Sequence, residues 1–439
     1  MSEQQSISIF GLGYVGAVTA GCLAKHGHQI IGVDVRQGKV DLINAGRSPI
    51  VERGIDDLIS GQVSAGRLVA TTNPQAAVEQ SQQSIVCVGT PSGPGGEINT
   101  QFVETVCREI GEAIGKKASY HTVVIRSTVL PGITRGTLIP ILEHSSGKVA
   151  GRDFGVCFNP EFLREASAIE DFNKPSKTVV GQFDAASGEA VVALYRDLPG
   201  PIVRTAIETA EMTKYADNAW HALKVSFANE IGSLSKMAGV DSHEVMEIFC
   251  QDTKLNLSAT YLKPGFAFGG SCLPKDVRAI VSMARKHKVE TPLLDSILPS
   301  NNAHLDRALR IIRTTGARKV GFLGLAFKAG TDDMRESPAV ILLQSLKSEG
   351  VEVAFFDEGA ALSRLTGENH QFLLGRVPDF ETLAAPDASA LAAMVDVLVV
   401  TQNTRAHRTI VENRRKDQVV IDLVHLEGQV PHDSYHQLC

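Results

Sequence analysis

The chain has 439 residues, 43 % of them hydrophobic, which is enough for two or three domains with buried cores. Its 43 basic and 49 acidic residues give a net charge of −6, which argues against a nucleic-acid-binding or membrane-surface protein. Neither a signal-peptide pattern nor a run of about 18 apolar residues is found, so we expect a cytoplasmic protein. Seven cysteines without a C-x-x-C pair favour free thiols over a disulfide scaffold or a metal site.

The first part of the chain alternates apolar runs typical of buried strands with helical patterns. The runs cover residues 6–12, 28–34, 83–91, 120–128, 153–161 and 177–183. This rhythm predicts an α/β fold with a parallel sheet and crossover helices. From 206 to 305 the strand signals stop, and a long proline-free stretch predicts a central helix. The α/β rhythm resumes near 318, so we predict domains over 1–205, 206–305 and 306–439.

A glycine motif directly follows the first predicted strand. Gly11, Gly13 and Gly16 form G-x-G-x-x-G, in which the first glycine permits a tight turn and the second lets backbone approach a pyrophosphate. The third allows close packing of helix on strand, as in Rossmann-like domains. Asp34 ends the second strand and can accept hydrogen bonds from ribose hydroxyls, which favours NAD over NADP. The nearby Arg36 and Lys39 keep NADP open as an alternative.

Two threonines stand at the ends of later predicted strands. Thr90 lies in VGTP and Thr128 in RSTV. Ligands of open α/β sheets bind outside the carboxyl ends of the strands, so both hydroxyls can reach a cofactor. Each could equally be a strand-end cap.

The predicted central helix carries a polar stripe. At about 100° per residue, one side gathers an ammonium, two amides and an imidazole, from Lys214, Asn218, Asn229 and His221. Apolar residues occupy the opposite side, at positions 212, 223, 227 and 234, and Trp220 lies near them. We expect the apolar side to form core and the polar side to face a ligand. A solvated polar face is the alternative, although such faces are usually rich in Lys and Glu.

Cys272 has neighbours that core packing does not need. Two glycines at 269–270 leave room for a ligand, and Pro274 suits the first turn of a helix. A thiol at a helix N-terminus is favoured as thiolate. Lys275 and Asp276 would share its side of that helix. The alternative is a buried structural thiol.

A thiol nucleophile beside a dinucleotide limits the reaction. Oxidation of an alcohol needs no covalent step, whereas oxidation of an aldehyde to an acid commonly proceeds through a thiohemiacetal and a thioester. The pair therefore indicates acid formation. A non-catalytic NAD-binding protein and a NAD-retaining epimerase or decarboxylase are alternatives of other classes.

Several motifs occur in an order that resembles the UDP-glucose/GDP-mannose dehydrogenase family. They read FGLGYVG, VGTPS, RSTVLPG, NPEFLRE, FGGSCLPKD and FKAGTDDMRESP, with the polar helix at 214–229 between the fourth and fifth. The resemblance covers nearly the whole chain. It implies a NAD-dependent, four-electron oxidation of a nucleotide sugar at C6, from hydroxyl to carboxylate.

Three further sequence segments resemble the branch of this family that acts on GDP-mannose. SPIVE, CQDTKLNLS and PGFAFGG carry that likeness. It implies GDP-mannose as substrate, GDP-mannuronate as product and a place in the supply of an alginate-type polysaccharide. It also implies that 1–205 binds NAD, 206–305 forms a dimer and 306–439 binds the sugar nucleotide. Domain-swapped homodimers or larger homo-oligomers with shared active sites are expected.

The resemblance also implies roles for individual residues. Cys272 matches the nucleophile, Lys214 and Asn218 the groups that stabilise an oxyanion, and Asp276 a group that assists water. The reaction centre would be lined by Thr128, Glu161 and Glu165, the last also touching substrate. Cofactor contacts would come from Tyr14, Val15, Asp34, Lys39, Thr90, Thr128, Lys275 and Arg335. Sugar-nucleotide contacts would come from His221, Asn229, Tyr261, Lys263, Phe266, Gly269 and Lys328.

The segment before PGFAFGG departs from the GDP-mannose branch. Thr260 stands where that branch has a tyrosine, and Lys263 where it has an arginine. A lysine cannot supply the bidentate fork of an arginine. UDP-glucose or another UDP-hexose is therefore the alternative substrate.

Overall fold

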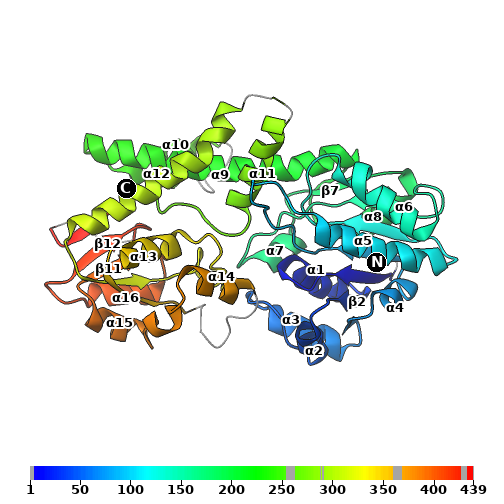
Figure 1. Ribbon diagram of the computed structural model, residues 1–439, viewed down its shortest axis with the longest axis horizontal. Helices are drawn as coiled ribbons and strands as arrows, with labels where there is room; N and C mark the ends of the chain where they lie inside the picture. Colours follow the sequence, from blue (N-terminus) through cyan, green and yellow to red (C-terminus); the bar gives the residue numbers. More distant parts are fainter. Residues whose placement is uncertain are drawn as a thin grey trace. The chain divides into compact units, whose positions relative to one another are not determined.

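The computed structural model describes residues 4–253, 263–286, 288, 291–358, 368–426 and 433–438. The chain forms two compact units, Met1–Asp217 and Asn218–Cys439 (Figure 1). The division falls inside a long helix, α9 (Ile207–Ala238).

An eight-stranded sheet organises the first unit, in the order β3-β2-β1-β4-β5-β6-β7-β8. Its strands are β1 (Ser6–Phe10), β2 (Gln29–Val33), β3 (Leu68–Thr71), β4 (Gln83–Val86), β5 (Thr122–Ile125), β6 (Gly155–Phe158), β7 (Thr178–Gln182) and β8 (Ile202–Thr205). Neighbours pair in parallel, except that β6 and β7 are antiparallel. The first six strands follow the Rossmann order, whose direction reverses between β1 and β4. A dinucleotide site is expected at that reversal.

Helices cover both faces of this sheet. They are α1 (Tyr14–Lys25), α2 (Gln37–Asn44), α3 (Ile55–Ser64), α4 (Pro74–Glu79), α5 (Gln101–Lys116), the π-helix η1 (Thr134–Leu138), α6 (Ile139–Ser146), α7 (Ala168–Asn173) and α8 (Ala185–Tyr195). One core packs α1, α2, α3, α7 and α8 on the sheet, and the other packs α4, α5, α6 and the start of α9. Successive strand residues point into opposite cores, as Ile9 and Phe10 do, so the inner strands of the sheet are covered on both faces.

The second unit holds a five-stranded parallel sheet in the order β10-β9-β11-β12-β13. Its strands are β9 (Lys319–Leu323), β10 (Glu352–Phe356), β11 (Val397–Val400), β12 (Val419–Asp422) and β13 (Tyr435–Gln437). Its helices are α10 (Ser242–Gln251), α11 (Leu273–Lys286), α12 (Pro292–Thr314), α13 (Pro338–Ser348), α14 (Glu368–Arg376), the 3-10 helix η2 (Phe380–Leu383), α15 (Ala388–Met394) and α16 (Arg405–Glu412). One core includes α12, α13 and α14, and the other α15 and α16. The prediction of two Rossmann-like parts around a helical middle is confirmed.

The burial of α9 reverses one prediction. Met212, Trp220 and Phe227 on its apolar side are 39 %, 44 % and 40 % exposed, whereas the polar Lys214 is only 4 % exposed. The expectation that this apolar side forms core is therefore wrong for these three residues, whereas Leu223 on the same side is half-buried. Small alanines of α9 fill the interior in their place, at positions 210, 219, 222 and 228.

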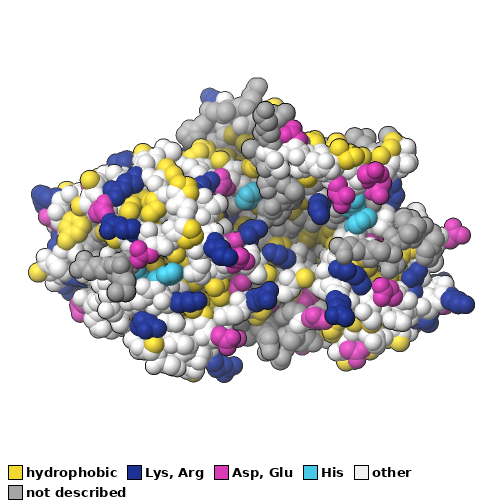
Figure 2. All heavy atoms as spheres, turned by 180° about the vertical axis from the view of Figure 1, so that it is seen from behind, with side chains coloured by type: hydrophobic (Ala, Val, Ile, Leu, Met, Phe, Trp, Pro, Cys, Tyr) yellow, Lys and Arg dark blue, Asp and Glu magenta, His cyan; other side chains and the backbone are white. Residues whose placement is uncertain are grey.

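The surface carries charges of both signs. Figure 2 shows acidic and basic side chains interspersed over one face of the molecule. Over the described residues, no helix has both the length and the apolar character that a membrane crossing requires.

Candidate active site

The turn after β1 has the geometry of a dinucleotide site. Gly11 takes a left-handed φ of +92°, and α1 begins directly after Gly13. A Cβ on Gly16 would lie 1.8 Å from the Gly11 carbonyl oxygen, so the close packing needs a glycine there. A Cβ on Gly13 would meet no atom within 4 Å. The space in front of this helix N-terminus is therefore open to a pyrophosphate, and the turn fits NAD.

Asp34 holds this turn in place. Its carboxylate accepts hydrogen bonds from the backbone N–H of Leu12 at 2.9 Å and of Arg36 at 3.0 Å. The Lys39 ammonium lies 3.2 Å from the same carboxylate. The carboxylate at the end of β2 suits ribose hydroxyls and opposes a 2′-phosphate.

The two predicted threonines lie side by side. The Thr90 hydroxyl, beyond β4, donates to the Thr128 carbonyl, beyond β5, at 2.9 Å. Thr90 is buried and Thr128 half-buried. Both therefore stand at the carboxyl edge of the sheet, where the fold places ligands.

Glu161 and Lys214 form a buried ion pair. The Lys214 Nζ lies 2.8 Å from Glu161 Oε1, and the other carboxylate oxygen accepts from the Leu163 N–H at 2.7 Å. Burial acts to raise the pKa of Glu161, but the Lys214 charge and these hydrogen bonds outweigh it and hold that pKa below its usual value. The pair therefore places the Lys214 side chain next to a buried carboxylate in the first part of α9.

Glu52 was not among the site residues predicted from the sequence. Its carboxylate accepts from the Tyr14 hydroxyl, in the first turn of α1, and from the Ala166 N–H at 2.8 Å. Ala166 has a left-handed φ of +68°, directly after Glu165. Burial and the Glu52 carboxylate both raise the pKa of Tyr14, so its hydroxyl remains a donor. Glu52 thus ties the glycine turn to the loop that carries Glu161 and Glu165. The motif SPIVE contained it, but no local pattern gave it a role.

Cys272 occupies the N-terminus of α11 in the second unit. Its carbonyl accepts the first helical hydrogen bond, from the Asp276 N–H at 2.9 Å, and the residue is exposed. The Ser271 hydroxyl lies 3.8 Å from its sulfur. Four other cysteines, at 22, 87, 107 and 157, are buried, and burial raises each of their pKa values to about 12. The exposed helix-terminal position therefore separates Cys272 from these inert thiols.

Asp276 is enclosed by two of its predicted neighbours. The amide of Asn218, in α9, donates to one carboxylate oxygen, and the Lys275 Nζ lies 3.2 Å from the other. Asp276 is 2 % exposed and Asn218 7 %. The second unit thus assembles the thiol, the carboxylate, the ammonium and the amide around the first turn of α11.

Three family models match the chain in order. The NAD binding domain of the UDP-glucose/GDP-mannose dehydrogenase family matches residues 5–199, its central domain 208–303 and its UDP binding domain 321–426. The chain belongs to the UDP-glucose/GDP-mannose dehydrogenase family. It is therefore a NAD-dependent oxidoreductase of nucleotide sugars, and the predictions of family, enzyme class and cofactor are confirmed.

Members of the family with known names and structures align along nearly the whole chain. A GDP-mannose 6-dehydrogenase from Pseudomonas aeruginosa is 49 % identical over 431 residues, covering 98 % of both chains. A ternary complex of GDP-mannose dehydrogenase from that organism is 48 % identical, with a TM-score of 0.58, and the match covers 99 % of this chain and 100 % of the other. A UDP-glucose dehydrogenase from the archaeon Pyrobaculum islandicum is 33 % identical, with a TM-score of 0.91, and the match covers 100 % of this chain and 98 % of the other.

The remaining predicted contacts of this family member lie in varied surroundings. Val15, His221 and Phe266 are half-buried, and Lys263 and Lys328 are exposed. The Arg335 guanidinium forms a bidentate pair with Asp333, at 2.9 and 2.7 Å. The Asn229 amide is engaged with backbone, accepting from the Gly265 N–H at 3.0 Å and donating to the Phe266 carbonyl at 3.3 Å. Tyr261 and Thr260 lie outside the described residues.

Proposed function

We propose that this chain is a GDP-mannose 6-dehydrogenase, which oxidises the C6 hydroxyl of GDP-mannose to the carboxylate of GDP-mannuronate. The observation that carries the proposal is the 49 % identity to the Pseudomonas aeruginosa enzyme of that name, over 98 % of both chains. The GDP-mannuronate formed would supply an alginate-type polysaccharide.

The proposed mechanism uses Cys272 as the nucleophile. NAD, when bound, accepts a hydride at each of the two oxidations. After the first, the Cys272 thiolate adds to the aldehyde carbon to give a thiohemiacetal, and loss of the second hydride leaves a thioester. Water then adds to the thioester carbon, the C–S bond breaks, and the sugar leaves as a carboxylate. The exposed sulfur at the start of α11 supports this role.

Other residues would stabilise charge and move protons. The Lys214 ammonium, paired with Glu161, would stabilise the oxyanion that forms on the carbonyl oxygen, with Asn218 as its partner. Asp276 would take a proton from the attacking water. Its carboxylate is buried and already hydrogen-bonded, which orients it. Thr128 and Glu165 would line the reaction centre.

A steady-state assay tests the proposal. Purified protein is supplied with NAD and GDP-mannose, and NADH and sugar products are quantified. We expect two NADH for each GDP-mannuronate. Cys272→Ser should give no acid product, and wild-type rates in that variant would refute the nucleophile assignment. Absence of NADH from GDP-mannose, with rapid turnover of another sugar nucleotide, would refute the substrate assignment.

UDP-glucose is the second candidate substrate. It is favoured by Lys263, which stands where the GDP-mannose branch has an arginine, and by the likeness to the Pyrobaculum islandicum UDP-glucose dehydrogenase. The same assay with UDP-glucose and a UDP-N-acetylhexosamine separates the candidates.

The proposal includes the setting of the enzyme. A free thiol nucleophile stays reduced in the cytoplasm, which supports that compartment. A homodimer with exchanged domains, or a larger homo-oligomer, is the assembly that the family resemblance supports. Sedimentation equilibrium measures the mass of the assembly, and a monomeric mass would contradict it.

A further inference from the structure

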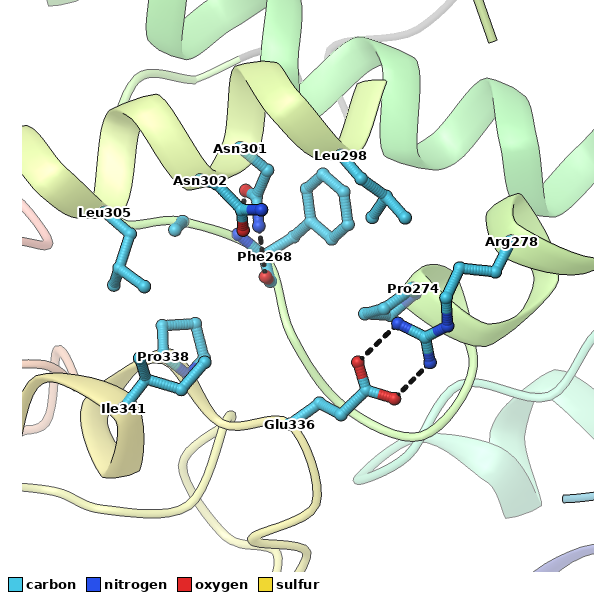
Figure 3. Close-up of a pocket in the computed structure, with 11 residues that line it drawn as sticks. Phe268, Pro274, Arg278, Leu298, Asn301, Asn302, Leu305, Glu336, Pro338 and Ile341 are labelled. Atoms are coloured by element: carbon cyan, nitrogen blue, oxygen red, sulfur yellow. Dashed lines mark hydrogen bonds and ion pairs between the residues drawn. The ribbon is translucent and has the colours of Figure 1, made fainter. Parts of the chain in front are cut away.

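The backbone just before Cys272 is held by side chains of neighbouring helices. Asn301, on α12, accepts a hydrogen bond from the Phe268 N–H at 2.9 Å and donates one to the Phe268 carbonyl at 2.9 Å. Figure 3 shows both bonds between the amide and the loop. One amide thus satisfies both polar backbone groups of one residue, as a partner strand does in an antiparallel pair.

Two more side chains hold the same loop. His304, one turn further along α12 and 1 % exposed, contacts the Gly265 carbonyl through Nε2 at 2.7 Å. From α9, Asn229 bonds the Gly265 N–H and the Phe266 carbonyl. The segment 265–268 belongs to no strand or helix, so side chains replace the ladder that would otherwise fix it.

A buried asparagine at position 301 does not stabilise α12 itself. Asparagine competes with helical hydrogen bonding, and an amide 8 % exposed has lost its water. Pro299, two residues earlier, already interrupts the helical hydrogen bonds of α12. Both bonds of Asn301 go to Phe268, which explains why a polar side chain is placed there.

The loop depends on these bonds because packing supports only part of it. A cavity of about 100 Å³ borders Phe268 and is lined also by Pro274, Leu298 and Ile341 (Figure 3). On the side of this cavity, no atoms of the described residues pack against the loop, so contact with neighbouring side chains would not replace lost hydrogen bonds there.

The far end of the loop is tight. A Cβ on Gly269 would lie 2.4 Å from the Glu336 carbonyl oxygen and 2.5 Å from Pro338. Arg278, on α11, pairs with the Glu336 carboxylate through both ends of its fork. Because the backbone at Gly269 is tightly packed, a displacement of the Phe268 backbone would be passed on to Cys272, four residues later.

We propose that Asn301 is a positioning residue, which sets the place of the Cys272 sulfur by fixing the backbone of Phe268. The inference rests on the proposed role of Cys272 as nucleophile. It assigns Asn301 no contact with substrate or cofactor. A displacement of a reacting atom by about 1 Å costs on the order of 10²-fold in rate, so the expected effect is large.

The test compares Asn301→Ala with Asn302→Ala, the adjacent exposed position on α12. We expect Asn301→Ala to lower kcat by about 10- to 100-fold while the KM for NAD stays at the wild-type value. Hydrogen exchange of peptides covering 264–272 should become faster. Asn302→Ala should match the wild type in both measurements. A wild-type kcat in Asn301→Ala, or equal losses in both variants, would overturn the proposal.

Asn301→Asp provides a second variant with its own signature. Its carboxylate accepts from the Phe268 N–H but repels the Phe268 carbonyl, whereas the protonated carboxyl can donate to it. Its kcat relative to the wild type should therefore rise as the pH falls. A constant ratio across pH would contradict the donor role of the amide.

Hydrogen exchange separates this proposal from the proposed function, because it needs no substrate. If the wild type oxidises neither GDP-mannose nor UDP-glucose, the proposed function fails and Asn301 is judged by exchange alone. Faster exchange over 264–272 in Asn301→Ala, but not in Asn302→Ala, then supports the proposal that Asn301 fixes the backbone of Phe268. Equal exchange in the two variants refutes it.

Discussion

Lys214 Nζ lies 2.8 Å from Glu161 Oε1, with side-chain exposures of 5 % and 9 %. The two residues are 53 positions apart and come from α9 and the loop after β6. Their pairing explains why a helix can bury an ammonium, because an unpaired charge at this depth would be costly.

Removal of one partner should be strongly destabilising. Lys214→Met leaves the Glu161 carboxylate buried without its counter-charge, which should lower the free energy of unfolding by about 3–5 kcal/mol. Adding Glu161→Leu should recover most of the loss. Urea denaturation of both variants measures this. Lys174→Ala, in an exposed pair with Glu170, should cost less than about 1 kcal/mol, and an equal loss there would contradict the argument.

Substitutions at two glycines of the dinucleotide turn should have different effects, one on NAD affinity and the other on stability. Gly13→Ala should raise the Kd for NAD and leave the unfolding midpoint unchanged, because its Cβ meets no protein atom within 4 Å. Gly16→Ala should lower the unfolding midpoint, because its Cβ would lie 1.8 Å from the Gly11 carbonyl. Calorimetry with and without NAD measures both. Loss of stability in Gly13→Ala with unchanged NAD affinity would refute the placement of the pyrophosphate.

Cysteine reactivity should follow burial. Iodoacetamide at pH 8 should alkylate the exposed Cys272 well before the buried thiols at 22, 87, 107 and 157, whose pKa values burial raises to about 12. Peptide mass spectrometry gives the order. In urea the four buried thiols should react readily. Early modification of Cys107 in the folded protein would contradict the described core.

The buried His121 should make stability depend on pH. Burial, and next the Lys117 charge, lower the pKa of His121 from 6.5 to about 3. Between these values the unfolded chain binds a proton that the folded chain does not, so stability present above pH 6.5 falls as the pH falls. One such proton contributes a slope of about 1.4 kcal/mol per pH unit.

His121→Gln should remove this slope. Unfolding free energies of the variant and the wild type are compared at several pH values between 6.5 and 3. His144→Gln, which removes an exposed imidazole, controls for the loss of one histidine. An unchanged slope in His121→Gln would show that the imidazole is protonated in the folded protein.

The strands that sequence patterns missed share a position. β3 and β8 form the two edges of the first sheet, whereas each of its six inner strands coincides with a predicted apolar run. Central strands of a parallel sheet are buried on both faces and read as continuous apolar runs. An edge strand such as IVRT at β8, with two exposed residues, carries no such run.

Local sequence determined the glycine turn, the carboxylate at the end of β2 and the helix that starts after Cys272, because each depends on residues within one or two turns. It also determined the family, through the order of its motifs. Only the tertiary structure decided which side of α9 is buried. Periodicity shows that a helix has two faces, but partners distant in sequence, Glu161 for Lys214 and Asp276 for Asn218, make the polar face the one that leaves water. No sequence pattern indicated a role for Asn301 either, because its amide bonds the backbone N–H and carbonyl of Phe268, 33 residues away.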